Sequence, residues 1–283
     1  MKKWTFIIDV AKCHDCNNCF LACKDEFCDN DHLPYSISQP NHGHRWMSIQ
    51  RTERGQYPRV DVGYLSQPCM HCDEPACLGA AENGSIYKRD DGIVIIDPVK
   101  SKGQKNLVDS CPYHAIWWNE EKQIPQKCTF CAHLLDNGWQ QPRCTQACPT
   151  GALSVEYLED NELTELVKKE VLEAYQPHLN THPRVYYKNL YRFTRCFISG
   201  SVALSDVDEC AEGAVVKLSA SHLENDLETI TNNYGDFKID NLIADGEKIM
   251  LQLKYSGYEK QIKHLELTNS TDLGTIHLSK NKP

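Results

Sequence analysis

The spacing of the cysteines constrains this chain more than any other feature of its sequence. Of the fifteen cysteines in 283 residues, twelve fall into three groups of four. The first group, Cys13, Cys16, Cys19 and Cys23, follows the pattern C-x2-C-x2-C-x3-C. In two-cluster iron–sulfur proteins this run supplies three thiolates to one 4Fe-4S cluster and the fourth thiolate to a second cluster. A complementary group is therefore expected elsewhere in the chain.

The complementary group begins with Cys128 and Cys131 and ends, after an insertion of twelve residues, with Cys144 and Cys148. The two-cluster rule then pairs the two groups crosswise. We predict that one 4Fe-4S cluster is held by Cys13, Cys16, Cys19 and Cys148. The second is predicted to be held by Cys23, Cys128, Cys131 and Cys144.

The remaining cysteines predict a third cluster. Cys69, Cys72 and Cys77 are close in sequence, and Cys111, which precedes a proline, is the available fourth ligand. A second complete repeat would need cysteines at four more positions, all serving one cluster, and these hold Ala81, Ser101, Gln104 and Leu107. Because the missing ligands would all have served one site, we predict three complete 4Fe-4S clusters and one lost cluster.

Other uses of the cysteines fit the spacing less well. Zinc takes four ligands per tetrahedral ion, and three cysteines at three-residue spacing with a Cys-Pro tail exceed that set. A disulfide framework is typical of exported chains, and no export signal is visible at the N-terminus. The cysteines outside the groups, Cys28, Cys196 and Cys210, are predicted to be free. His14, His71 and His133 lie beside cluster cysteines and are predicted to tune the clusters or face solvent rather than to bind iron.

Composition narrows the partners and the location. The net charge is −9 and no basic block interrupts the mixture of acids and bases, so nucleic acid is not an expected partner. No stretch approaches the roughly 20 apolar residues of a membrane span, so we expect no direct membrane insertion and a cytoplasmic location. No nucleophile, phosphate loop or acid–base pair is evident, and therefore no catalytic residue is predicted on this chain.

The sequence pattern changes twice along the chain. Residues 1–155 are rich in Cys, Pro and Gly, and a helix is expected from Glu162 to Ala174, with Asp160 or Asn161 as its cap. A basic, aromatic segment over residues 183–195 is expected to be extended and to link two domains. Short alternating runs separated by turn signals follow and predict an all-β sandwich. We therefore expect an iron–sulfur domain over 1–195 and a β domain over 196–283.

The cysteine pattern resembles that of the iron–sulfur subunits of molybdenum enzymes in the dimethyl-sulfoxide-reductase family. These subunits carry two ferredoxin repeats with a wide insertion in the last group, as between Cys131 and Cys144. The resemblance extends along nearly the whole chain to members with three clusters, through segments such as 43–47 and 183–193. It implies a large catalytic partner that holds molybdenum on two molybdopterin guanine dinucleotides and acts on polyhydroxylated aromatic rings, with this chain as a non-catalytic electron-transfer subunit.

The C-terminal part resembles transthyretin-like, carboxypeptidase-regulatory sandwiches, with an Ig-like architecture, through segments 200–202, 214–218, 234–237 and 257–258. The expected fold class is thus α+β, a double bacterial-ferredoxin-like domain followed by this sandwich. Two alternatives for function stay open at this point. The partner could be a related hydroxylase or dehydroxylase of resorcinol or catechol type, or the chain could be a free ferredoxin-like electron carrier.

Overall fold

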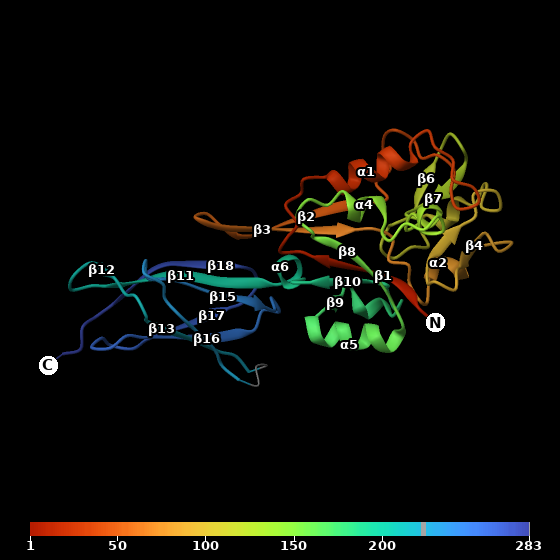
Figure 1. Cartoon of the computed structure of the whole chain (residues 1–283). Coiled ribbons are helices and arrows are strands. Elements are labelled where there is room, and N and C mark those ends of the chain that lie inside the picture. Colours follow the sequence, from red (N-terminus) through yellow and green to blue (C-terminus); the bar gives the residue numbers. More distant parts are fainter. Residues whose placement is uncertain (222–224, 283) are drawn as a thin grey trace. The chain divides into compact units, whose positions relative to one another are not determined.

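A computed structural model describes residues 1–221 and 225–282 of the chain (Figure 1). The chain divides into two compact units, of which the first consists of Met1–Arg51 with Tyr64–Leu190 and the second of Thr52–Gly63 with Tyr191–Pro283. The division cuts through one hairpin, formed by β2 (Ser48–Gln56) and β3 (Arg59–Gln67). The domain boundary expected after residue 195 stays a prediction.

The first unit contains short elements joined by long loops, as expected for a region organised by its cysteines. Its helices are α1 (Asn18–Phe27), α2 (Ala76–Gly79), α3 (Ala132–Leu135), α4 (Arg143–Gln146) and α5 (Asp160–Glu170), with 3-10 turns η1 (Lys105–Leu107) and η2 (Pro177–Leu179). Its other strands are β1 (Lys3–Asp9), β4 (Ile86–Lys88), β5 (Val94–Ile96), β6 (Trp117–Asn119), β7 (Ile124–Gln126), β8 (Leu153–Leu158), β9 (Glu173–Ala174) and β10 (Val185–Lys188).

The main sheet of the first unit has the order β8-β1-β10-β9, and β1 is paired on both sides (Figure 1). β1 runs antiparallel to β8 and parallel to β10, so Phe6 faces Val155 on one side and Val185 on the other. Phe6 and Ile8 are fully buried, which fits a strand paired along both edges. Two further pairs, β4 with β5 and β6 with β7, form separate two-stranded ribbons.

Helix α5 begins two residues earlier than the sequence pattern indicated. The Glu159 side chain caps the helix, and the backbone N–H of Glu159 donates to the Glu162 carboxylate at 2.8 Å. This reciprocal capping box satisfies two N–H groups that the first turn leaves without partners. The helix ends at Glu170, because Val171 takes a left-handed conformation and the next residues enter β9.

The second unit is almost entirely β-structure. Its elements are α6 (Tyr191–Thr194), β11 (Cys196–Leu204), β12 (Glu209–Cys210), β13 (Val215–Ser219), β14 (Leu227–Ile230), β15 (Asp236–Leu242), β16 (Lys248–Lys254), β17 (Gln261–Glu266) and β18 (Thr271–Leu278). One sheet joins β12, β11 and β15, with β18 pairing in parallel with β11, and the other has the order β14-β13-β16-β17. Both sheets contribute to one hydrophobic core that includes Ile198, Phe237, Val216 and Leu251.

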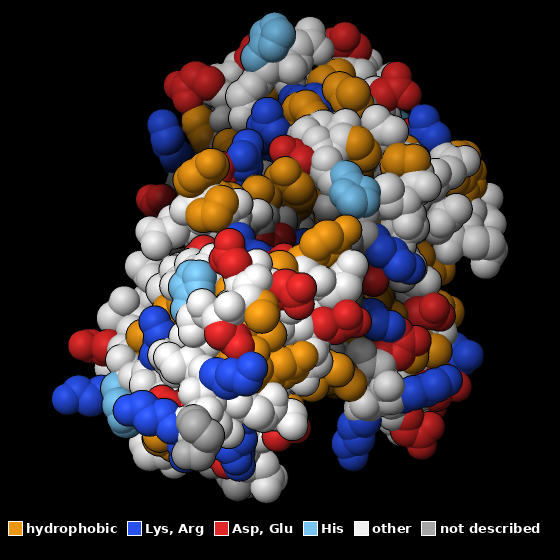
Figure 2. Space-filling model, turned by 90° about the vertical axis from the view of Figure 1, so that its left-hand side faces the viewer, with side chains coloured by type: hydrophobic (Ala, Val, Ile, Leu, Met, Phe, Trp, Pro, Cys, Tyr) orange, Lys and Arg blue, Asp and Glu red, His pale blue; other side chains and the backbone are white. Residues whose placement is uncertain are grey.

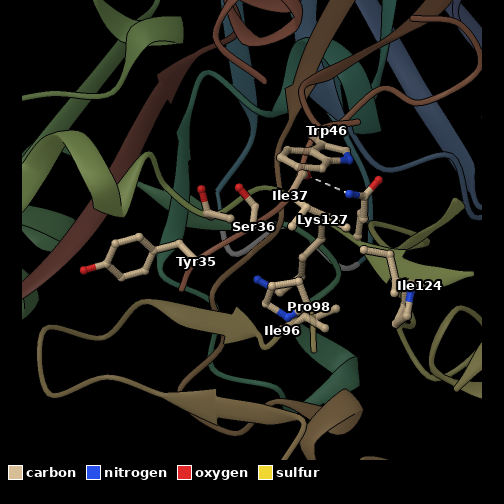
Figure 3. Close-up of a pocket in the computed structure, with 11 residues that line it drawn as sticks. Tyr35, Ser36, Ile37, Trp46, Ile96, Pro98, Ile124 and Lys127 are labelled. Atoms are coloured by element: carbon tan, nitrogen blue, oxygen red, sulfur yellow. Dashed lines mark hydrogen bonds between the residues drawn. The ribbon is translucent and has the colours of Figure 1, made fainter. Parts of the chain in front are cut away.

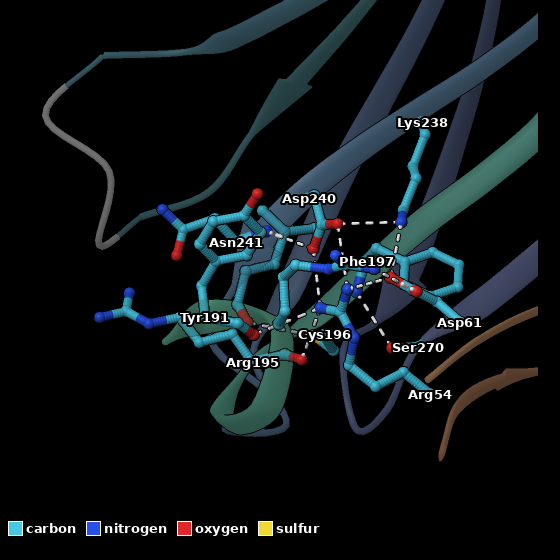
Figure 4. Close-up of polar contacts among 12 residues, drawn as sticks. Arg54, Asp61, Tyr191, Arg195, Cys196, Phe197, Lys238, Asp240, Asn241 and Ser270 are labelled. Carbon is cyan, nitrogen blue, oxygen red and sulfur yellow. Dashed lines mark hydrogen bonds and ion pairs between the residues drawn. The ribbon is translucent and has the colours of Figure 1, made fainter. Parts of the chain in front are cut away.

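The hairpin tip that belongs to the second unit is held there by a buried arginine (Figure 4). Arg54 is 5% exposed and pairs with Asp61 on the hairpin and with Asp240 on β15, at 2.5 and 2.9 Å. Lys238 completes the network by pairing with Asp240 at 2.9 Å. The residue after Arg54 must be glycine, because a Cβ at the left-handed position of Gly55 would meet the Phe197 ring and the Arg59 carbonyl.

The network predicts a specific response to acid. Burial raises the pKa of Asp61 and Asp240, but hydrogen bonds from Arg54 and Lys238 outweigh it and hold both pKa values below their ordinary range. A carboxyl whose folded-state pKa is depressed contributes stability above its unfolded-state pKa of about 3.9, and loses that contribution as the pH falls through the folded-state value. We expect the Tm difference between wild type and Arg54→Met to be constant from about pH 7 to pH 5 and to shrink below about pH 4. A difference that stayed constant down to about pH 3 would contradict this role of the carboxylates.

One face of the surface carries both signs of charge. The face shown in Figure 2 intersperses acidic and basic side chains, in line with the mixed composition. Across the described residues, none of the helices combines the length and the apolar character needed to cross a bilayer.

Candidate metal centres

The first cysteine group forms a tight loop that leads into α1. Asp15 and Asn17 take left-handed backbone conformations, and the Asn17 amide donates to the Asp15 carbonyl at 2.9 Å, which curls the loop between Cys13 and Cys19. Cys19 and Cys23 lie one turn apart on the buried face of α1. The outer thiols of the group, those of Cys13 and Cys16, are half-buried and exposed, respectively.

The complementary group lies next to the first, because α4 packs beside α1. α4 carries Cys144, and Cys148 follows it, while Cys128 and Cys131 occupy the loop before α3. In that loop, Phe130 and Cys131 have positive φ angles of 58° and 52°. The Phe130 N–H donates to the Cys128 sulfur at 3.4 Å, so the backbone itself contacts a predicted ligand.

Several thiols have their electrostatic neighbours within the predicted set, although Cys128 and Cys144 also have neighbours in other sets. Burial raises the pKa of Cys19 to about 12, with further contributions from the negative charges of Cys13, Cys148 and Cys16. Burial raises the pKa of Cys23 well above its ordinary value, helped by Cys128 and Cys144. The pKa of Cys131 is raised in the same way, by burial and then by Cys23 and Cys128.

The third group surrounds one cavity. All four of its cysteines line this cavity, namely Cys69, Cys72, Cys77 and Cys111, and Lys127, Tyr113 and Thr181 line it as well. Burial raises the pKa of Cys72 to about 12 and that of Cys77 to about 11, and charge on the other thiols of the group adds to both shifts. α2 positions Cys77, and the loop after η1 brings in Cys111.

The donor sets fit iron–sulfur clusters. All fifteen cysteines carry free thiols. Ionising four buried thiols is costly, because the thiolates repel one another and are removed from water. A cationic centre can neutralise them, and iron supplies that positive charge. Four thiolates are also the complete ligand set of a 4Fe-4S cluster. Each of the three predicted ligand sets therefore has the number and the kind of ligands that such a cluster takes.

Cys148 differs from the other thiols in its hydrogen bonding. Although burial raises its pKa, hydrogen bonds from the Thr150 hydroxyl and from the backbone N–H groups of Thr150, Ala152 and Leu153 outweigh it and lower the pKa of Cys148. Hydrogen bonds to sulfur also favour the more negative, reduced state of a cluster. The loop after Cys148 therefore has the geometry to tune the cluster that this thiol would serve.

Two of the histidines beside the cysteines, His71 and His133, have other partners. His71 is buried, its Nδ1 accepts from the Val94 N–H at 3.1 Å, and burial lowers its pKa well below the ordinary value, so the ring is neutral. The Nε2 of His133 lies 2.9 Å from the Glu26 carboxylate.

The positions that the sequence analysis assigned to a lost cluster include a hydrogen-bonded glutamine. Ser101 and Leu107 are fully buried, and Gln104 is 8% exposed. The Gln104 side-chain oxygen accepts from the Ser85 hydroxyl at 2.8 Å, and its amide donates to the Lys100 carbonyl at 2.9 Å. Gln104 thus links the segment around Ser85 to the segment around Lys100.

Sequence reasoning missed two residues of the third site. Lys127 and Thr181 both line the cavity, and the Thr181 hydroxyl is 2.7 Å from that of Tyr113. Thr181 comes from a loop far along the chain, so spacing gave no signal for it. Lys127 directly precedes Cys128, and a lysine beside a cluster ligand was the available signal.

Comparison with known proteins agrees with the cysteine pattern. A family model described as a 4Fe-4S dicluster domain matches residues 60–158. The chain is 44% identical, over 98% of its length, to the whole of the pyrogallol hydroxytransferase small subunit of Pelobacter acidigallici. It is 28% identical, over 66% of its length, to 73% of a tetrathionate reductase chain of Salmonella typhimurium. It is 33% identical, over 56% of its length, to 75% of a probable anaerobic dimethyl sulfoxide reductase chain of Escherichia coli.

These three relatives are all named as single chains or subunits of larger enzymes. They include chains of multi-subunit molybdenum enzymes, and the 4Fe-4S dicluster model covers the grouped cysteines from Cys69 to Cys148. The likeness to the first of them spans both units rather than the cysteine region alone. The chain therefore belongs to the family of the pyrogallol hydroxytransferase small subunit, among the iron–sulfur electron-transfer subunits of dimethyl-sulfoxide-reductase-family molybdenum enzymes.

Proposed function

We propose that this chain is the electron-transfer subunit of a two-subunit molybdopterin enzyme that transfers hydroxyl groups on polyhydroxylated aromatic rings. The observation that carries the proposal is 44% identity along the entire length of a relative named as the small subunit of a pyrogallol hydroxytransferase. The other named relatives match a smaller share of the chain, at 66% and 56% of its length. The substrate class of the first relative is therefore the best-supported one for this chain.

The chain's contribution is to hold three 4Fe-4S clusters through the twelve grouped cysteines. The clusters supply one-electron transfer when bound. The fold keeps water away from the second and third predicted ligand sets, whose eight cysteines are all buried. Low exposure keeps the local dielectric low and makes neighbouring charges and hydrogen bonds effective in setting the potentials.

We infer that the ligand sets form a series from the charges that act between their thiols. Charge on Cys19 contributes to the raised pKa of Cys144, which links the first set to the second. Charge on Cys69 contributes to the raised pKa of Cys128, which links the second set to the third. Because Cys16 is exposed, the first set is the one closest to solvent and offers the natural point of electron exchange with a partner.

The catalytic partner is expected to hold the molybdenum on two molybdopterin guanine dinucleotides and to bind the ring. The small-subunit name of the first relative supports such a large partner. The second unit, with two sheets around one core, fits a transthyretin-like sandwich that docks or stabilises the complex. We assign the complex to the cytoplasm.

Metal analysis of the complex tests the proposal. The complex is isolated from its native host through this chain, and iron, acid-labile sulfide and molybdenum are measured. We expect about twelve irons and about twelve sulfides per chain, with about one molybdenum per complex, and hydroxyl transfer between polyhydroxybenzenes. Twelve irons without molybdenum, in a chain that elutes alone, would instead favour a free electron carrier. Molybdenum together with net hydroxylation or dehydroxylation of resorcinol or catechol would move the assignment to that related class.

A further inference from the structure

Lys127 is a buried cation without a carboxylate partner. The residue is 2% exposed, and its Nζ donates to the carbonyl oxygens of Val94 and Cys128, the latter at 3.0 Å. Within residues 1–221 and 225–282, no ion pair joins this ammonium group to an acid. An ammonium group removed from water is costly unless negative charge lies nearby. The two neutral carbonyls satisfy its hydrogen bonds but do not supply that charge.

The surroundings of Lys127 are apolar on one side and thiol-rich on the other. On the apolar side it borders a small pocket with Ile96, Pro98 and Ile124 (Figure 3). On the other side it lines the cavity of the third cysteine group. The positive charge of Lys127 acts against burial to lower the pKa of Cys77 and of Cys111, which places the ammonium group within electrostatic reach of those sulfurs.

We propose that the Lys127 ammonium group is the counter-charge of the cluster held by Cys69, Cys72, Cys77 and Cys111, and that it raises the reduction potential of this cluster. The inference rests on the proposed function, because it requires a redox-active cluster in that cavity. Reduction adds one electron, supplied by the redox partner, which is itself oxidised by one electron. The added negative charge interacts favourably with a nearby cation, and more so where the dielectric is low.

Lys127 also lies close to one predicted ligand of the second set. Its Nζ donates to the Cys128 carbonyl at 3.0 Å, and its positive charge lowers the pKa of Cys128. The third set is distinguished by its cavity, which the buried Lys127 side chain lines together with all four cysteines of the set. The main effect of Lys127 is therefore expected on the third cluster, with a smaller effect on the second.

The test is a potentiometric titration of the complete complex, followed by electron paramagnetic resonance of its clusters. Lys127→Met removes the charge at similar length, and Lys127→Arg keeps it. Lys122→Met is the matched control, because Lys122 is an exposed lysine between β6 and β7. In Lys127→Met we expect the third cluster, identified as the signal that is missing from Cys111→Ala, to show an approximately tenfold lower ratio of reduced to oxidised form at fixed potential, a shift of about 59 mV for one electron. Lys127→Arg and Lys122→Met should leave all midpoints unchanged.

Iron content separates this proposal from the proposed function. Full iron with unchanged midpoints in Lys127→Met would overturn the role of Lys127 while leaving the three clusters in place. If Lys127→Met loses iron, Lys127→Gln, which can still donate to the same carbonyls, takes its place in the titration. Loss of iron from both variants would show that Lys127 builds the site rather than sets its potential, and would also overturn the proposal. Wild-type complex without three clusters would refute the proposed function itself.

Discussion

Replacing Cys111 by alanine is expected to remove about four of the roughly twelve irons per chain and to leave the other two clusters in place. Cys111 is buried and is the member of its group that lies far from the other three in sequence. The cavity that it lines contains no other unassigned thiol that could replace it among the described residues. A cluster with three of its four thiolates is open to solvent attack and is lost or degraded.

The measurement is iron and labile sulfide per chain in the purified complex, together with the resonance signals of the reduced clusters. Cys28→Ala is the matched control, because Cys28 directly follows α1, close to the first group, but is predicted to bind no iron. It should keep its full iron content. Loss of about eight irons in Cys111→Ala, or loss of iron in Cys28→Ala, would contradict the ligand assignment.

The ligand sets can be predicted from sequence because most cysteines that bind one cluster are close together in the chain. Groups of cysteines at two- and three-residue spacing define the loops, and the crosswise rule then links groups that are distant in the chain. The thiols that raise the pKa of Cys19 and Cys23 belong to the predicted sets, whereas Cys69 of the third set also raises the pKa of Cys128. The three clusters and the lost fourth one stay predictions.

What surrounds the clusters could not be predicted in the same way. Thr181 and Lys127 reach the third cavity through contacts that no periodicity encodes. The parallel pairing of β1 with β10 joins the two ends of the first unit, and such pairing depends on the whole fold. The β2–β3 hairpin was not anticipated at all, because its alternating polar residues resemble a solvated loop until Arg54 is seen to be buried.

Replacing Arg54 by methionine is expected to destabilise the second unit by about 3 kcal/mol, a substantial part of a domain's stability. The physical reason is that Asp61 and Asp240, which are 20% and 25% exposed, lose the cation that neutralises both of them. Removing one partner of a buried ion pair costs about 3–5 kcal/mol, and the lower end applies because Lys238 and Arg192 still pair with these acids.

The change should be measured as the shift in the thermal transition of the second unit in the intact chain, by circular dichroism in the region of β-structure. Lys238→Met is the matched control: it removes a cation from the same network, but its side chain is 40% exposed, so we expect a loss below about 1 kcal/mol. Iron content should be unchanged in both variants, because neither residue contacts a cysteine group. Equal destabilisation by the two substitutions would mean that the network acts through general surface charge, and that the burial of Arg54 does not anchor the hairpin.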